Sequence, residues 1–222
     1  MKQTPIHFNY NSEILRIIPT DINRIVEVGC SSGALAKAYA TLNPSCEYIG
    51  IEIDPGFAEI AKESCSKVIC GDIEGFDEEK FLRLFPSDCW VFGDTLEHLY
   101  DPWALLKRIR PQLAQGATLI ACIPNAQHWS LQVNLNRGLF RYQDQGLMDR
   151  THIRWFTRTT LIELFESSGY KVINGFPWIF DEPKREKFLP SISAMALAIG
   201  VDPQQAVNDA IPYQWVVKAT PA

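Results

Sequence analysis

Short runs of consecutive apolar residues alternate with amphipathic stretches through the first half of the chain. Strands that are covered on both faces of a sheet have this composition, because neither face meets water. We therefore predict five strands in this half of the chain, at Arg24–Val28, Glu47–Ile53, Lys67–Cys70, Cys89–Phe92 and Ala117–Ile123.

Amphipathic segments lie between these runs and predict the connecting helices. They are Ala34–Leu42, which follows a glycine, Pro55–Ser64, which begins with a proline, and Pro102–Leu113, whose apolar residues recur at helical spacing. Strand–helix–strand alternation implies right-handed crossovers, a parallel sheet and helices on both of its faces.

The second half of the chain interrupts this alternation twice. Residues Pro124 to Arg154 form a long stretch rich in Asn, Gln and aromatic residues, which predicts a functional excursion rather than a crossover. A helix capped by Thr157 and a sixth strand at Tyr170–Ile173 follow. A second insertion, Asp181 to Pro212, is rich in proline and predicts two short helices before a closing strand at Tyr213–Ala219.

Length and composition are those of one folded domain. A chain of 222 residues and 25.2 kDa fits a single α/β domain with added segments. Hydrophobic residues at 46% and charged residues at 21% exclude a disordered, collagen-like or coiled-coil chain. We therefore expect one domain over residues 1–222, with insertions at about 124–155 and about 181–212, and the sequence leaves the role of the second insertion open.

Charge and hydropathy bear on partners and location. The net charge of −5 gives no overall attraction for nucleic acid or anionic lipid. The first eleven residues lack the apolar run of a signal peptide, and the longest weakly polar run, Ile192 to Val201, is about half of what a bilayer span needs. We expect a cytoplasmic protein without a membrane span or a nucleic-acid partner, and its oligomeric state stays unknown.

The six cysteines form no CxxC pair, and several fall inside the predicted strands. This pattern predicts free, buried thiols, and we expect no metal site.

A glycine-containing loop, Glu27 to Gly33, lies where the first predicted strand passes into the first predicted helix. Glycines let the backbone approach a ligand closely, and a helix N-terminus offers unpaired N–H donors. The spacing differs from the G-x-G-x-x-G of dinucleotide sites and from a P-loop, which disfavours both. The alternative is a tight turn that binds nothing.

Acidic residues follow the next three predicted strands: Glu52, Asp72 and Asp94. Each alone is most simply a helix cap. Together they stand at the carboxyl edge of a parallel sheet, where such folds bind ligands, and a carboxylate at the position of Glu52 can accept two hydrogen bonds from a ribose.

With these motifs the sequence resembles the class I S-adenosylmethionine-dependent methyltransferases over nearly its whole length. The resemblance implies a Rossmann-like, seven-stranded, mostly parallel sheet whose last strand is antiparallel, with S-adenosylmethionine as cofactor and S-adenosylhomocysteine as product. It implies that Glu27 organises the loop, that Glu52 holds the ribose and that Asp72 bonds the adenine amino group beside the backbone of Ile73. The cofactor-binding residues that it implies are Glu27, Gly29, Cys30, Gly33, Glu52, Ile53, Asp72, Ile73, Asp94 and Leu96. In this chain Glu27 replaces the usual Asp of the motif and Ser32 replaces its middle glycine.

The stretch from Gly93 to Trp103 resembles the family's fourth motif, with Leu-Glu-His after the strand next to the methyl group. The run Asp149 to Phe156, within Ile123 to Phe156, resembles a subgroup associated with bacterial glycan and surface-polysaccharide gene sets and sometimes fused to glycosyltransferases. That resemblance suggests a carbohydrate acceptor and assigns the insertion at about 124–155 to the acceptor side as a cap.

Methyl transfer is an in-line displacement, so the protein has to position the acceptor and exclude water. An alcohol must also lose its proton. His98 and His152 are the candidate general bases, and Asp149 either orients one of them or accepts from the substrate hydroxyl. The alternative for both histidines is a bracing hydrogen bond within the protein.

Aromatic and basic side chains also gather in the first insertion. The aromatic residues are suited to stack on a sugar or to pack the insertion, and the arginines to hold an acidic group of the acceptor or to form surface ion pairs. These residues are Trp129, Phe140, Tyr142, Trp155 and Phe156, and Arg137, Arg141, Arg150 and Arg154.

We therefore expect an S-adenosylmethionine-dependent methyltransferase that acts on a small molecule, favouring the hydroxyl of a carbohydrate or glycan precursor. Three alternatives stay open: a quinone or other small-molecule O-methyltransferase, a scaffold that binds the cofactor without catalysis, and a nicotinamide oxidoreductase, which the missing G-x-G-x-x-G disfavours.

Overall fold

The computed structural model describes residues 8–222, and most of the N-terminal stretch considered above therefore lies outside the described residues. Seven strands form one sheet in the order β3-β2-β1-β4-β5-β7-β6. All neighbouring strands are parallel except that β7 runs antiparallel to both β5 and β6, which confirms the predicted fold class. The strands are β1 (Arg24–Val28), β2 (Glu47–Glu52), β3 (Lys67–Cys70), β4 (Cys89–Gly93), β5 (Thr118–Pro124), β6 (Tyr170–Trp178) and β7 (Gln214–Pro221).

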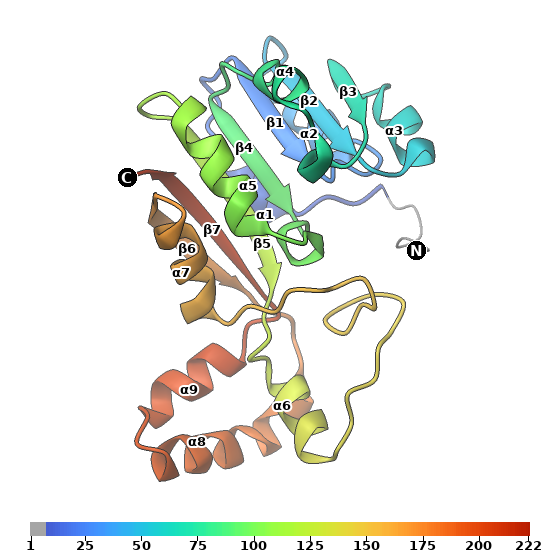
Figure 1. The fold of residues 1–222 in the computed structure, drawn as a ribbon. Helices are drawn as coiled ribbons and strands as arrows, with labels where there is room; N and C mark the ends of the chain where they lie inside the picture. Colours follow the sequence, from blue (N-terminus) through green and yellow to red (C-terminus); the bar gives the residue numbers. More distant parts are fainter. Residues whose placement is uncertain (1–7) are drawn as a thin grey trace.

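Helices cover both faces of this sheet (Figure 1). The helices contribute to two separate clusters of buried side chains. One cluster contains side chains of α1, α2 and α3, and the other contains side chains of α4, α5 and α7. These helices are α1 (Ser12–Ile17), α2 (Ala34–Tyr39), α3 (Pro55–Ala61), α4 (Glu78–Leu82), α5 (Pro102–Ile109) and α7 (Arg158–Ser167). The predicted cap of α7 is confirmed, because the Thr157 side chain accepts a hydrogen bond from the Thr160 amide.

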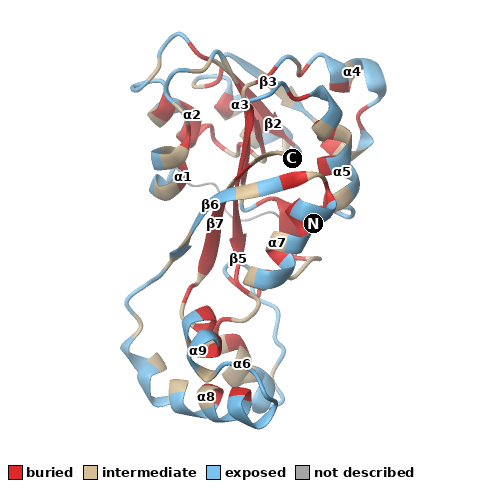
Figure 2. Ribbon diagram, turned by 90° about the vertical axis from the view of Figure 1, so that its left-hand side faces the viewer, coloured by how far each residue is buried: buried red, intermediate tan, exposed pale blue. Residues whose placement is uncertain are grey.

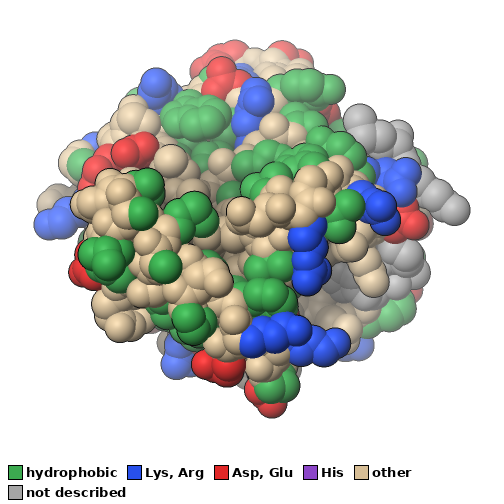
Figure 3. Space-filling view, turned by 90° about the horizontal axis from the view of Figure 1, so that it is seen from below, with side chains coloured by type: hydrophobic (Ala, Val, Ile, Leu, Met, Phe, Trp, Pro, Cys, Tyr) green, Lys and Arg blue, Asp and Glu red, His purple; other side chains and the backbone are tan. Residues whose placement is uncertain are grey.

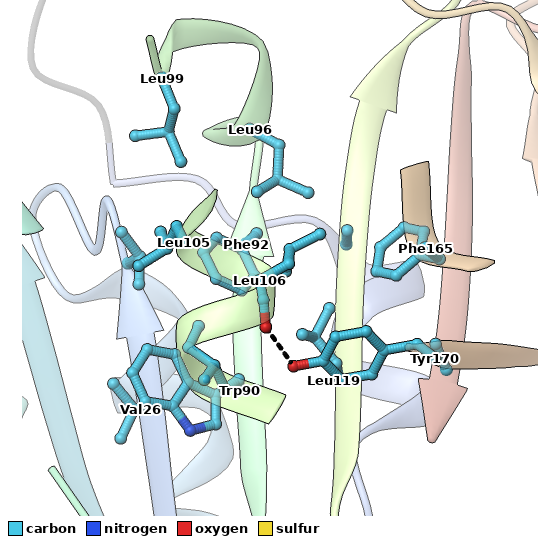
Figure 4. Packing of buried hydrophobic residues seen from close by; sticks show 14 of the residues in the cluster. Val26, Trp90, Phe92, Leu96, Leu99, Leu105, Leu106, Leu119, Phe165 and Tyr170 are labelled. Atoms are coloured by element: carbon cyan, nitrogen blue, oxygen red, sulfur yellow. Dashed lines mark hydrogen bonds between the residues drawn. The ribbon is translucent and has the colours of Figure 1, made fainter. Parts of the chain in front are cut away.

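The larger cluster lies on the α4, α5 and α7 side. Figure 4 shows Trp90 and Phe92 of β4 in one buried cluster with Leu105 and Leu106 of α5. The Tyr170 hydroxyl donates a hydrogen bond to the Leu106 carbonyl oxygen at 2.9 Å, so its one polar group is satisfied inside the core. Full burial of such apolar side chains stabilises the fold by about 1.5–3 kcal/mol each.

Three further helices form a lobe beyond the carboxyl end of β5 (Figures 1 and 2). They are α6 (Trp129–Asn136), α8 (Leu189–Ala198) and α9 (Pro203–Ala210). Trp129 of α6 packs on a small cluster made by α8 and α9, so the two insertions fold together. We call this lobe, with the segment 137–155, the cap. Seen from below in Figure 3, hydrophobic side chains are scattered over its face among polar ones.

A hydrogen-bonded clamp joins the two insertions. Oε2 of Glu182 lies 3.0 Å from Nε2 of His128 and accepts a hydrogen bond from Nε1 of Trp129 at 3.0 Å. The ring of Phe188 stacks on Trp129 with centroids 5.5 Å apart. The second insertion, whose role the sequence left open, therefore builds half of the cap.

Several elements differ from expectation. The sequence analysis did not predict α1, α4 or α6, and β6 is longer than its predicted four residues. All six cysteines are unpaired within the described residues, as expected, but Cys70 is exposed rather than buried. Among residues 8–222, none of the helices has the length and apolar composition needed to span a membrane.

Candidate functional site

The glycine loop packs directly against the turn that follows β4. Gly29 has φ +74°, and its amide donates to the Ile51 carbonyl at 2.8 Å. A Cβ at this position would lie 2.5 Å from Oγ1 of Thr95. Gly33, also with positive φ, has the backbone of Ala61 at 3.2 Å from a built Cβ. Both glycines are therefore required by the backbone conformation and by close packing.

Glu52 closes the other side of the loop. Its Oε2 accepts from the Ser31 amide at 2.8 Å and its Oε1 from the Asp54 amide at 2.9 Å. The residue is buried, and each oxygen keeps acceptor capacity, because an ionised carboxylate offers about four lone-pair positions. Ser31 itself has a positive φ, which sequence reasoning did not signal.

Glu27 and Cys30 are buried beneath the loop. Burial raises the pKa of Glu27 to about 8, although the Tyr48 hydroxyl donates to its Oε2 at 3.0 Å. A hydrogen bond with Cys65 and burial raise the pKa of the Cys30 thiol, which makes it unreactive. Both residues are buried, so neither side chain offers an exposed group to a ligand.

The residues expected at the adenine end are divided between surface and core. Ile53 is 56% exposed directly after Glu52, whereas Ile73 is buried. Asp72 is exposed, and its Oδ1 accepts from the Glu74 amide at 3.0 Å, so it caps the short 3-10 turn Ile73–Gly75.

The turn after β4 carries Asp94 and Leu96. Asp94 has φ +55°, remains exposed, and accepts a hydrogen bond from Nε2 of Gln214. Leu96 is fully buried in the core, which leaves only its backbone for a ligand. Gln214 and Thr95 were missed by sequence reasoning, since their positions depend on how β7 and the glycine loop meet this turn.

These features fit the S-adenosylmethionine that the resemblance implies. Gly29 has no side chain and packs closely on Thr95, so the loop offers only its backbone at this position. Glu52 stands beside it with spare acceptor positions. An apolar side chain exposed at Ile53 suits a planar ring, and Asp94 has an exposed carboxylate on the same carboxyl edge.

The histidines predicted as catalytic meet each other. The rings of His98 and His152 lie edge to face with centroids 4.8 Å apart. Nδ1 of His98 lies 3.1 Å from the Thr151 carbonyl oxygen and Nδ1 of His152 lies 3.1 Å from the Leu147 carbonyl oxygen. Burial lowers the pKa of both imidazoles, so both favour the neutral form.

The expected side-chain hydrogen bond between Asp149 and His152 is not formed, although the His152 amide donates to the Asp149 carbonyl oxygen at 3.1 Å. Oδ1 of Asp149 accepts instead from the Thr151 amide at 2.8 Å and the Thr151 hydroxyl at 2.6 Å. The segment turns without a helix there, so the spacing of three residues does not align the two side chains. Asp149 still acts electrostatically on both imidazoles.

Glu97 lies beside this pair and was not selected from the sequence, although it is the middle residue of Leu-Glu-His. It is 1% exposed, its Oε1 is 4.0 Å from Nε2 of His152, and neither carboxylate oxygen has a hydrogen-bond partner. Burial raises the pKa of Glu97 well above its ordinary value, and the nearby Asp94 carboxylate adds to the rise.

Aromatic rings continue from His152 into the cap. Trp155 contacts His152 with centroids 5.9 Å apart, Phe140 contacts Trp155 at 5.8 Å, and Tyr142 contacts Phe140 at 5.6 Å. Phe140 and Tyr142 are half exposed, so this aromatic row offers a surface for a ligand.

The four arginines of the first insertion have different environments. Arg150 forms an ion pair with Asp144 at 2.6 Å, Arg154 donates to the Tyr100 carbonyl, and Arg137 lies over a phenylalanine ring. Arg141 is exposed and lines a hollow of about 120 Å³ with Phe140 and Met148.

The chain is similar to known methyltransferases in sequence and in fold. A model described as "Methyltransferase domain" matches residues 9–174. An uncharacterized protein of Synechococcus sp. is 30% identical over 100 residues, which are 43% of this chain and 24% of that protein. The chain thus spans about a quarter of the length of that relative.

Solved structures share the fold at low sequence identity. An O-methyltransferase from neocarzinostatin biosynthesis, in complex with S-adenosylhomocysteine and 1,4-dihydroxy-2-naphthoic acid, is 15% identical with a TM-score of 0.58, covering 95% of this chain and 52% of that one. A possible histamine N-methyltransferase from Thermotoga maritima is 18% identical with a TM-score of 0.60, covering 94% and 86%. At such identities the likeness concerns the fold.

Proposed function

The chain belongs to the methyltransferase-domain family, and from this membership we propose that it transfers a methyl group from S-adenosylmethionine to a hydroxyl group of a carbohydrate or glycan precursor. The observation that supports this best is the meeting of the glycine loop, Glu52 and the turn after β4 at one edge of the sheet, with a cap beyond that edge.

The chain's own residues have distinct parts in holding the cofactor. Bound S-adenosylmethionine supplies an electrophilic methyl group on a sulfonium sulfur. The backbone from Gly29 to Gly33 would hold its methionine end, Glu52 would accept from the ribose hydroxyls, and Ile53 would cover the adenine ring. Asp72 bonds the adenine amino group, as the sequence resemblance implies.

The acceptor hydroxyl is activated beside His98 and His152 in this proposal. Both rings direct Nδ1 toward a backbone carbonyl, which leaves each Nε2 with a lone pair. Such a lone pair can accept the proton of the acceptor hydroxyl. Asp149 contributes negative charge to this region rather than a hydrogen bond to His152.

The acceptor lies against the cap in this proposal. The aromatic row from Trp155 to Tyr142 suits a sugar ring, and Arg141 suits an acidic group such as the phosphate of a nucleotide sugar. The resemblance of the run Asp149 to Phe156 to the glycan-associated subgroup supports the same acceptor class.

An aromatic hydroxyl compound is the second candidate acceptor. The same aromatic row suits a planar ring, and the O-methyltransferase with this fold from neocarzinostatin biosynthesis is in complex with a dihydroxynaphthoic acid. In this case the chemistry of transfer is unchanged and only the acceptor differs.

Mass spectrometry with isotopically labelled S-adenosylmethionine tests the proposal. The protein is incubated with two matched acceptor panels, one of sugars and nucleotide sugars and one of quinols and dihydroxynaphthoic acids. Label on the first panel supports the proposal. Label on the second panel alone supports an aromatic hydroxyl compound as the acceptor instead. If the protein binds S-adenosylhomocysteine but labels neither panel nor any compound of a cell extract, the result contradicts catalysis and favours a scaffold. If NAD alone raises the melting temperature, the result favours an oxidoreductase.

A further inference from the structure

Three side chains with metal-ligating atoms meet at the turn after β4. Their nearest ligand atoms, one each from Glu97, His98 and His152, all lie within 4.8 Å of one another. We propose that these three residues bind one divalent transition-metal ion, with zinc as the best fit, next to the methyl-transfer site. This reverses the expectation from the sequence that no metal site is present.

The distances are close to those of a coordination sphere. Zinc bonds of 2.0–2.1 Å to nitrogen place tetrahedral ligand atoms about 3.4 Å apart. Nε2 of His152 and Oε1 of Glu97 are 4.0 Å apart, so ligand-atom movements of about 1 Å or less would close the sphere.

Both imidazoles are already oriented as metal ligands. A carbonyl oxygen can only accept, so the contacts with Thr151 and Leu147 require that Nδ1 of each ring carries the proton. Each Nε2 then has its lone pair free, and a histidine that binds metal through one nitrogen usually donates from the other in this way.

Glu97 has no other partner that explains its burial. Both of its oxygens lack hydrogen bonds, and no Lys or Arg forms an ion pair with it among the described residues. An isolated buried carboxylate is unfavourable unless it is neutralised or coordinates a cation. Its main chain is fixed, since the carbonyl oxygen accepts from the Ile153 and Arg154 amides at 3.0 Å each.

The ligand set selects the class of ion. Two imidazole nitrogens with one carboxylate suit zinc and its first-row neighbours, whereas calcium and magnesium prefer oxygen ligands throughout. Three protein ligands leave a coordination position open, as in catalytic rather than structural zinc sites.

The cluster adjoins the cofactor loop. Thr95 donates from Oγ1 to the Val28 carbonyl at 2.8 Å and packs on Gly29, and Glu97 follows two residues later. The role of the ion rests on the proposed function: it binds the acceptor oxygen as a Lewis acid and the hydroxyl proton is released to water. The oxygen then forms a bond to the methyl carbon while the carbon–sulfur bond breaks and leaves its electron pair on sulfur.

The test uses the full chain, stripped of metal with a chelator and titrated with Co²⁺. We expect visible absorption bands that saturate at one ion per chain and disappear when Zn²⁺ is added, with elemental analysis giving one zinc per chain. Glu97→Gln and His98→Gln should each lower Co²⁺ affinity at least tenfold. The matched control is His128→Gln, since His128 is also buried beside a glutamate but its two ring nitrogens are occupied by Ser130 and Glu182; it should retain wild-type affinity.

The outcomes separate this site from the proposed function. Absence of saturable Co²⁺ and Zn²⁺ binding, or wild-type affinity in folded Glu97→Gln and His98→Gln, overturns the metal site, even if S-adenosylhomocysteine binds and methyl transfer proceeds. Binding of one metal ion per chain that is weakened by Glu97→Gln and His98→Gln supports the site. This holds even if calorimetry detects no S-adenosylhomocysteine binding and the proposed function fails. Equal methylation rates in metal-free and zinc-loaded protein overturn the catalytic role.

Discussion

Nε2 of His152 lies 4.0 Å from Oε1 of Glu97, and the backbone amides that directly follow His152 donate to the Glu97 carbonyl oxygen at 3.0 Å. These contacts join the turn after β4 to the end of the first insertion. Because backbone hydrogen bonds hold the two segments together, the main chains that carry the imidazole and the carboxylate have a fixed relative position. The candidate catalytic histidines therefore lie where the sheet meets the cap.

Replacing Glu52 with Gln should weaken S-adenosylhomocysteine binding while the protein stays folded. The variant loses charge-assisted acceptance from the ribose, worth about 1.5–3 kcal/mol, so we expect affinity to fall roughly 10- to 150-fold. Isothermal titration calorimetry measures the change. Glu47→Gln, at the opposite end of β2, serves as the control, and an unchanged affinity for folded Glu52→Gln would exclude the ribose assignment.

Gly29→Ala should destabilise the fold more than Gly116→Ala. Both glycines have positive φ, so both substitutions carry a backbone cost of about 1–3 kcal/mol. Only at Gly29 does the new Cβ also meet an obstacle, Oγ1 of Thr95 at 2.5 Å, whereas nothing lies within 4 Å at Gly116. Urea denaturation of both variants measures the difference. Equal losses would mean that Thr95 moves aside without cost.

The stability of the wild type should contain a pH-dependent contribution from Glu27. Its pKa is about 8 in the folded state and 4.5 when unperturbed, so the folded chain binds more protons between these values. The free energy of unfolding therefore decreases as pH rises from about 4.5 to 8, by at most roughly 5 kcal/mol from this group. Glu27→Gln should remove that slope. Relative to the wild type, the free energy of unfolding of the variant should therefore be higher at pH 8 than at pH 5.

Urea denaturation at pH 5, 6.5 and 8 checks this contribution. Tyr48→Phe is the companion variant: it removes the hydrogen bond that lowers the pKa of Glu27, so it should extend the decline to higher pH. If the free energies of the wild type and Glu27→Gln run parallel with pH, then Glu27 titrates normally in the folded protein.

Glu182→Ala should loosen the cap from within. It leaves the Trp129 indole N–H and the His128 ring without their shared acceptor, at a cost of about 1–3 kcal/mol. Hydrogen exchange should show faster exchange in α6 and α8 with β1 and β4 unaffected. Glu186→Ala, an exposed residue of the same turn, is the matched control and should change stability by less than about 0.5 kcal/mol. Unchanged exchange in Glu182→Ala would show that the clamp adds nothing to cap stability.

The central sheet could be predicted from the sequence because strands buried on both faces are runs of consecutive apolar residues. Every residue of β5 is buried, and its apolar run identified it without any knowledge of its neighbours. The same applies to the glycine loop and to Glu52, since a loop after the first strand and an acid after the second reach one edge in any sheet of this topology.

The cap could not be predicted in this way. In α6 the apolar residues Trp129, Leu131, Val133 and Leu135 alternate with polar ones, which is the period of a strand, yet the segment is helical. Alternating residues spread around a helix, and here Trp129 packs on α8 and α9 while Leu131 packs beside Met148. Two separate partners, supplied by distant parts of the chain, stabilise a helix that local periodicity does not specify.

The sequence alone thus determined the sheet, and it predicted the cofactor edge and two candidate catalytic histidines, because those features depend on residues a few positions apart or on a common topology. Only the tertiary structure decided that Asp149 bonds Thr151, that Glu97 stands unpartnered beside His152, and that the second insertion completes the cap. The positions of these contacts do not follow from local sequence patterns, because they form only when the segments pack together in the folded chain.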